Sequence, residues 1–90
     1  GLPHRTVFCI FEDRDGALWF GTLEGLARWR EEAPEGERWR VYDDVRDGLS
    51  SKRVYAIQQD RRGTLWIGSL RAVDKRVSDG RFEAVRGEQS

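Results

Sequence analysis

Cysteine and long apolar runs are scarce in this 90-residue sequence, and each scarcity excludes a class of protein. The single Cys9 cannot form an intrachain disulfide and has no partner at metal-ligand spacing, so neither a disulfide scaffold nor a zinc site is expected. No apolar run approaches the roughly 18 residues that a membrane-spanning helix needs, and the N-terminus has no signal-peptide pattern. The cellular compartment therefore cannot be deduced from targeting signals.

Net charge is also absent. Sixteen basic and sixteen acidic residues give a formal charge of zero, and only Lys52 and Lys75 among the basic residues are lysines. This balance removes the usual electrostatic argument for nucleic acid or an anionic membrane as the main partner. We therefore expect no nucleic-acid partner and no membrane insertion of this segment.

An internal repeat is the strongest signal that is present. Shifting the chain by 47 residues aligns residues 1–22 with 48–69 without a gap, and ten of the 22 positions are identical. Further along, Trp39 matches Phe82 only after a four-residue deletion, so the second copy is shorter. A period of about 40–50 residues is typical mainly of propeller blades and helical repeats.

Short apolar runs between turn signals favour propeller strands over helical repeats. Each copy contains four such runs: the first over residues 7–11, 18–20, 26–30 and 38–42, and the second near 54–59, 65–69, 72–77 and 81–85. No stretch shows helical periodicity with caps at both ends. The sequence therefore predicts an all-β fold of two four-stranded antiparallel propeller blades, residues 1–47 and 48–90, which belong to a closed propeller or assemble into one.

The repeated residues also carry a family likeness. Asp, Gly, Leu-Trp and Gly-Thr recur at fixed offsets over residues 1–30, and most of this pattern returns over 48–69. The pattern resembles the two-component regulator propeller repeat. The second copy departs from it after Ser69, where Ala72 replaces the glycine found at Gly25.

This resemblance implies a sensor architecture. Proteins with such repeats usually carry many of them, folded as two propellers, often followed by a membrane helix and a histidine kinase or another output domain. In relatives from gut bacteria the propellers are periplasmic and recognise polysaccharide breakdown products. The resemblance thus implies a non-catalytic, extracytoplasmic ligand-sensing module, with any kinase activity outside this chain.

Positions shared by the two copies are expected to be scaffold. The aspartates begin a turn that ends in glycine, and side-chain capping of that turn explains both residue types. The tryptophans could be stacking platforms for sugars, but their equal placement favours filling the wedge between blades. Cys9, aligned with Ala56, is expected to pack in the core. The structural repeat positions are Asp13, Gly16, Trp19 and Gly21 in the first copy and Asp60, Gly63, Trp66 and Gly68 in the second.

Differences between the copies concentrate in the loops before the first strand and between the second and third. In a propeller these loops open on one face, which usually binds ligands. Arginine binds carboxylates bidentately, so a basic rim is a candidate site for an acidic saccharide, with an ordinary solvated rim as the alternative. The candidate ligand-binding residues are His4, Arg5, Glu24, Lys52, Arg53 and Arg71. The acidic loop 31–37 is expected on the opposite face.

Catalysis is not expected. Asp13 and Asp60 occur once per copy, and nothing places them within the roughly 5–9.5 Å that paired glycosidase carboxylates need. The turn after Asp13 lacks the further oxygen ligands of a calcium loop. His4 has no activated Ser or Cys nearby in the sequence. We therefore expect no catalytic residue, metal or cofactor, and an enzyme such as a lyase or hydrolase is the weakest hypothesis.

A structural role is the main alternative to ligand sensing. Two blades alone would leave apolar faces and sheet flanks open, and such surfaces drive association. The partners under this hypothesis are further blades or copies of the chain, three or four of which would close a ring of six or eight blades.

Overall fold

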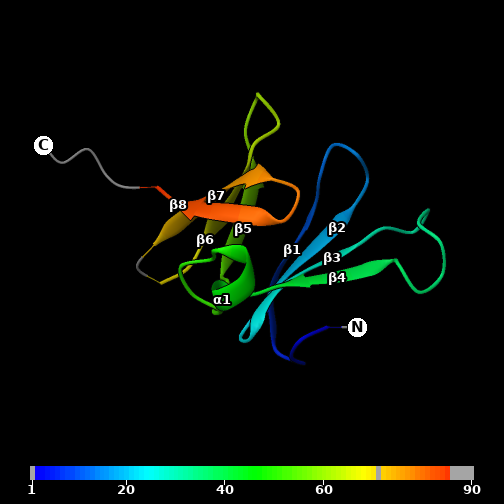
Figure 1. The fold of residues 1–90 in the computed structure, drawn as a ribbon, viewed down its shortest axis with the longest axis horizontal. Coiled ribbons are helices and arrows are strands. Elements are labelled where there is room, and N and C mark those ends of the chain that lie inside the picture. Colours follow the sequence, from blue (N-terminus) through cyan, green and yellow to red (C-terminus); the bar gives the residue numbers. More distant parts are fainter. Residues whose placement is uncertain (1, 71, 86–90) are drawn as a thin grey trace, which may run out of the picture.

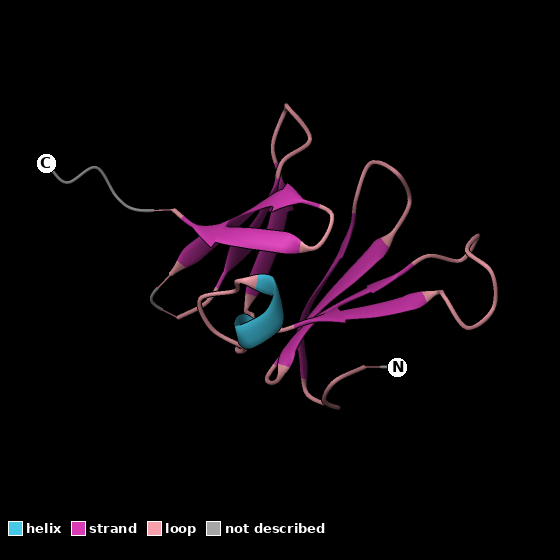
Figure 2. Ribbon diagram, viewed as in Figure 1, coloured by secondary structure: helices cyan, strands magenta, loops and turns pink. Residues whose placement is uncertain are grey.

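Two four-stranded antiparallel sheets make up the molecule (Figures 1 and 2). The computed structural model describes residues 2–70 and 72–85. Each strand pairs with the next one in sequence, which is the meander of a propeller blade, so the all-β prediction is confirmed. The first sheet contains β1 (Val7–Glu12), β2 (Leu18–Thr22), β3 (Gly25–Trp29) and β4 (Trp39–Tyr42); the second contains β5 (Ala56–Gln59), β6 (Leu65–Gly68), β7 (Val73–Ser78) and β8 (Arg81–Ala84).

The two sheets keep the same register despite the shorter second copy. Trp19 lies opposite Arg28 across β2 and β3, and Trp66 lies opposite Lys75 across β6 and β7. Residues 47 apart therefore occupy equivalent places through the first three strands of each sheet. The replacement of glycine by Ala72 does not shift this register.

One capped helical turn forms in a stretch that has no helical periodicity in the sequence. A single helical turn, α1 (Asp44–Asp47), lies in the connection between the sheets. The Asp43 side chain accepts a hydrogen bond from the backbone N–H of Arg46 at 2.7 Å, and Gly48 ends the turn with a φ of 89°. Four residues are too few to show apolar periodicity, so local capping forms this turn. Within the described residues, no helix is long and apolar enough to cross a membrane.

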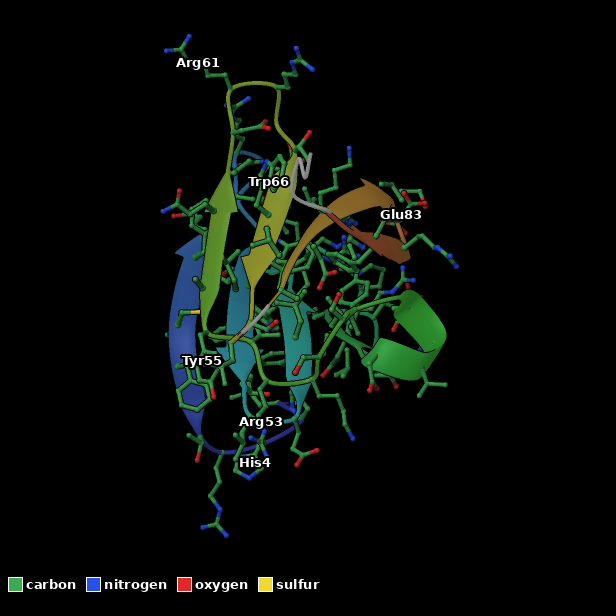
Figure 3. The ribbon with its side chains drawn as sticks, turned by 90° about the vertical axis from the view of Figure 1, so that its left-hand side faces the viewer. His4, Arg53, Tyr55, Arg61, Trp66 and Glu83 are labelled. Carbon is green, nitrogen blue, oxygen red and sulfur yellow. The ribbon has the colours of Figure 1, made fainter. Side chains whose placement is uncertain are left out.

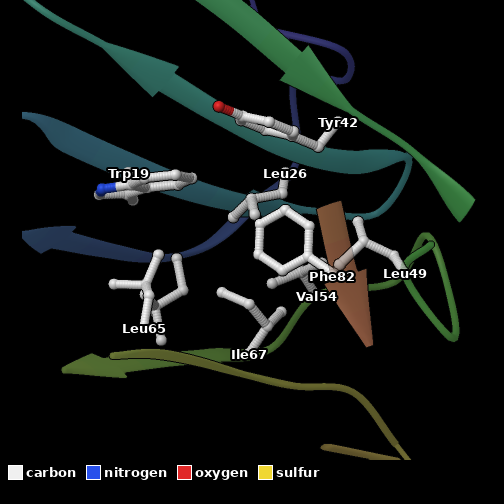
Figure 4. Packing of buried hydrophobic residues seen from close by; sticks show 9 residues of the cluster. Trp19, Leu26, Tyr42, Leu49, Val54, Leu65, Ile67 and Phe82 are labelled. Carbon is white, nitrogen blue, oxygen red and sulfur yellow. The ribbon is translucent and has the colours of Figure 1, made fainter. Parts of the chain in front are cut away.

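The hydrophobic core lies between the facing surfaces of the two sheets (Figure 4). Alternation along the strands sends every second side chain to this interface and the others to the far side of each sheet. Burying each large apolar side chain contributes roughly 1.5–3 kcal/mol before the entropic cost of ordering it. The core comprises Trp19, Leu26 and Tyr42 from the first sheet, Leu49 and Val54 from the connection, and Ile57, Leu65, Ile67 and Phe82 from the second.

Candidate functional site

The repeated aspartates are engaged by their own turns. Oδ1 of Asp13 accepts hydrogen bonds from the backbone N–H groups of Asp15 and Ala17 at 2.9 and 3.0 Å, and Oδ2 accepts one from Trp19 Nε1 at 2.7 Å. Asp60 accepts the equivalent three bonds in the second sheet. Its bond from the Trp66 indole is the largest cause that holds the pKa of Asp60 below its ordinary value. These carboxylates therefore tie each turn to its tryptophan.

The loops proposed as a rim lie at one end of the molecule. In Figure 3, His4 and Arg53 lie at this end and Arg61 lies at the opposite end. The His4 ring accepts a hydrogen bond from the backbone N–H of Thr6 at 2.9 Å through Nδ1, so the ring orders its own loop.

The charged residues of the rim differ in whether they already form an ion pair. Lys52 Nζ lies 3.6 Å from Glu24 Oε1, so these two side chains pair across the sheets. Arg5 and Arg53 are exposed, and Arg71 lies outside the described residues. Of the rim arginines on the second sheet, Arg53 is therefore the one within the described residues that is exposed and can contact a ligand.

Two aromatic side chains at matching repeat positions meet at this end of the inner strands. The ring centroids of Phe8 and Tyr55 lie 4.6 Å apart at an interplanar angle of 47°, and the two residues are 41% and 37% exposed. Phe8 lies at a register shift in β1 between Val7 and Cys9. The pattern of the sequence did not identify this pair as a surface feature.

A hollow of about 310 Å³, lined in part by Arg53, opens at this end of the second sheet. Arg53 and three serine residues line it together with apolar groups, and no described carboxylate belongs to its wall. The lining residues are Ser50, Ser51, Arg53, Ser69, Leu70 and Ala72. The arrangement offers hydroxyl groups, a guanidinium and an apolar patch within one concavity.

The family model described as two component regulator propeller matches residues 1–24 and 48–71, more than half of the chain. The chain belongs to this propeller family. The matched segments span the repeated turns and stop at the end of the rim loops. Among curated proteins no match was found.

The two tryptophans at the repeated position of the propeller blades lie in different surroundings. Trp19 is fully buried between the blades, stacked on Tyr42 at 5.6 Å between ring centroids and flanked by the guanidiniums of Arg28 and Arg76 at 5.5 and 5.2 Å. Trp66 lies on the far side of the second blade and is partly exposed. The same position is therefore wedged between blades in one copy and open in the other.

An ion cluster, which we call the Asp79 cluster, joins the outer strands of the two blades. Asp79 accepts from Arg40 at 2.9 Å and from Arg76 at 2.7 Å, and Arg28 lies at 3.5 Å. Burial by itself raises the pKa of Asp79, but the three guanidiniums together outweigh it and hold the pKa below its ordinary value. Arg28 and Arg40 are too far from Asp79 in the sequence for spacing to indicate the cluster.

The opposite end of the propeller blades has a different chemistry. A hollow of about 380 Å³ there has three carboxylates in its wall, Asp13, Asp15 and Asp79, together with Arg62 and Arg76. Two of these carboxylates are held by a turn or by arginines as described above. The balance of opposite charges makes this end a poorer anion site than the hollow at Arg53.

Reactive and metal-binding groups are sparse in the described part of the chain. No three His, Cys, Asp or Glu side chains gather there to hold a metal ion. Burial raises the pKa of the Cys9 thiol, opposed by a weaker backbone hydrogen bond from Gly21. A raised pKa lowers the thiolate fraction at neutral pH, which makes Cys9 a poor nucleophile.

Proposed function

We propose that these blades form a ligand-binding module of a bacterial two-component signalling protein, without catalytic activity of its own. The ligand is an acidic saccharide, or another small carboxylate, bound at the end of the molecule that carries His4, Arg53 and Tyr55. The module lies outside the cytoplasm, and the output domain that responds to binding lies elsewhere in the signalling protein. Family membership supports the signalling role, and the rim supports the ligand class.

The single observation that carries the ligand class is that Arg53 and the exposed rings of Phe8 and Tyr55 lie at the same end of the molecule (Figure 3). A guanidinium forms paired, charge-assisted hydrogen bonds with a carboxylate. An exposed aromatic ring offers a flat apolar surface for the C–H face of a sugar ring. The hydroxyls of Ser50 and Ser69 in the hollow donate their protons to Asp74 and to the backbone oxygen of Ala72, and their oxygens can still accept hydrogen bonds from sugar hydroxyls.

Calorimetric titration with an oligogalacturonate and with the neutral galactose oligomer of the same length tests the proposal. We expect the acidic sugar to bind more tightly. Arg53→Ala should weaken its binding at least about tenfold, because a hydrogen bond to a charged group is worth about 1.5–3 kcal/mol. Arg61→Ala, which removes an exposed arginine at the opposite end, is the matched control and should leave binding unchanged.

The aromatic contribution is tested separately. Tyr55→Phe keeps the ring and should retain most of the binding, whereas Tyr55→Ala should weaken both the acidic and the neutral sugar. Equal affinity of the wild type, Arg53→Ala and Arg61→Ala for the acidic sugar, or no heat with either sugar, would overturn the proposed ligand class.

A further inference from the structure

Asp74 in β7 is a buried carboxylate that holds the start of a rim loop, residues 50–53, which we call the Ser50 loop. Asp74 is only 1% exposed. Its Oδ2 accepts a hydrogen bond from the backbone N–H of Ser50 at 2.9 Å, and its Oδ1 accepts one from the Ser50 hydroxyl at 2.6 Å. Both oxygens of the carboxylate therefore hold one residue, and that residue lines the hollow at Arg53.

The first blade lacks both partners of this contact. A shift of 47 residues aligns Asp74 with Ala27, and the strand pairing gives the same equivalence. The same shift aligns Ser50 with Pro3. Alanine has no acceptor in its side chain, and proline has no backbone N–H to donate. The acceptor and its donors are thus absent together in one blade and present together in the other.

A second hydrogen bond of the Ser50 loop is shared by both blades. The backbone N–H of Arg53 donates to the Ser51 hydroxyl at 3.1 Å. In the first blade the backbone N–H of Thr6 donates to His4 Nδ1 at 2.9 Å, and these residues are the repeat equivalents of Arg53 and Ser51. This bond belongs to the scaffold of the repeat. The contact between Asp74 and Ser50 is found only in the second blade, on which the hollow at Arg53 opens.

Stability alone does not account for a carboxylate at this place. A carboxylate that is taken out of water loses its hydration, and a nearby cation usually offsets that cost. Within the described residues, no basic side chain forms an ion pair with Asp74. Ala27 fills the equivalent place of the first blade and is fully buried there. The residue that the carboxylate holds therefore explains its presence better than packing does.

We propose that Asp74 is a positioning residue of the rim site. It fixes the start of the loop that carries Arg53, and it takes the proton of the Ser50 hydroxyl, so that the oxygen of Ser50 is left to accept a hydrogen bond from a sugar hydroxyl. Ser69 is held in the same sense, because its hydroxyl donates to the backbone oxygen of Ala72 at 3.2 Å. This inference rests on the proposed function, since it concerns how the same site meets the acidic sugar.

A double-mutant cycle, measured by calorimetric titration of the 90-residue chain with an oligogalacturonate, tests this role. Asp74→Ala and Ser50→Ala should each weaken binding roughly two- to tenfold, the worth of one neutral hydrogen bond. Because Asp74 acts through Ser50, the double variant should lose less affinity than the two single losses combined. Asp13→Asn is the control, since it removes a hydrogen bond at the opposite end of the blades and should leave the affinity unchanged.

Amide hydrogen exchange without sugar tests the anchoring of the loop independently of the ligand. Asp74→Ala should speed exchange of the Ser50 N–H by about tenfold or more relative to that of Val54, because the lost bond is one to a charged group. The Val54 N–H donates to the backbone oxygen of Thr22 at 3.0 Å and does not involve Asp74. Asp13→Asn should leave the ratio of the two rates unchanged.

The two measurements separate failure of this inference from failure of the proposed ligand. Additive losses in the cycle, or an unchanged exchange ratio in Asp74→Ala, would overturn the positioning role. No heat from the wild type, together with faster exchange at Ser50 in the variant, would overturn the ligand class and support the anchoring of the loop. Asp74→Asn, which keeps the size of the side chain but can accept only one of the two bonds, replaces Asp74→Ala if the alanine variant does not fold.

Discussion

The indole N–H of Trp19 donates to Oδ2 of Asp13, six residues earlier, at 2.7 Å. The same bond joins Trp66 to Asp60 at 2.8 Å, but the two indoles differ in burial. A buried donor that loses its acceptor costs the full desolvation penalty, whereas a partly exposed one can turn to water. The repeat therefore contains two chemically identical hydrogen bonds that contribute differently to the stability of the fold.

Replacing each aspartate by asparagine measures that difference. Asparagine can still accept the backbone bonds of the turn through its oxygen, but its amide group cannot accept from the indole. We expect Asp13→Asn to lower the free energy of unfolding by about 1–3 kcal/mol. Asp60→Asn should lower it by less. Urea denaturation at one protein concentration measures both, and an equal or larger effect of Asp60→Asn would contradict the assignment.

The Asp79 cluster predicts a pH dependence with a definite sign. The pKa of Asp79 in the folded chain lies below its ordinary value, so its stabilisation is complete above the unfolded pKa of about 3.9. It is lost as the pH falls through the lower folded pKa. Asp79→Asn should therefore destabilise the chain by about 0.2–1 kcal/mol at pH 7, the range of exposed ion pairs. This difference should vanish in strong acid.

Thermal unfolding of the wild type and of Asp79→Asn, measured at a series of pH values from neutral to acid, gives the stability difference at each pH. Glu83→Gln is the control, because it removes an exposed carboxylate of β8 that makes none of the described ion pairs. A gap between the wild type and Asp79→Asn that widens below pH 4 would contradict the sign derived above.

Gly48 should tolerate substitution far less well than another glycine of the same backbone conformation. Both Gly48 and Gly36 have a φ near +90°. A Cβ at Gly48 would collide with the backbone oxygen of Phe82, whereas one at Gly36 would meet open space. Gly36→Ala should cost about 1 kcal/mol for the left-handed conformation alone. Gly48→Ala should cost clearly more, and equal midpoints in urea would contradict the close approach of the connection to β8.

The Cys9 thiol should react slowly while the chain is folded. Burial raises its pKa, so less thiolate is present at pH 8 than in an unfolded chain. Alkylation by iodoacetamide, followed by mass spectrometry, should be several-fold slower in buffer than in concentrated urea. Equal rates in both conditions would show that the thiol is not shielded by the second blade.

The strands could be predicted from the sequence because each apolar run ends at a turn signal that needs no tertiary context. The helical turn at Asp44–Asp47 was missed, since four residues carry caps but no periodicity. The unequal burial of Trp19 and Trp66 could not be predicted from the sequence either, because the two residues occupy the same position of the repeat. What distinguishes them is that only the first has a blade beside it.

The candidate site was predicted in part. The rim loops do lie at one end of the molecule, but the prominence of Arg53 arises because Lys52 pairs with Glu24. The Phe8–Tyr55 pair could not be deduced, since Phe8 lies at a register shift that the alternation of residues does not reveal. Contacts between blades combine residues some 47 positions apart, and spacing alone does not predict them.

The central claim, that the rim at Arg53 binds an acidic saccharide, is tested most directly by an NMR titration of backbone amides with an oligogalacturonate. The account predicts that shifts concentrate at Ser50–Tyr55 and around Phe8, with the turn Asp60–Thr64 at the opposite end unaffected. Shifts that concentrate in that turn instead, or none at saturating sugar, would contradict it.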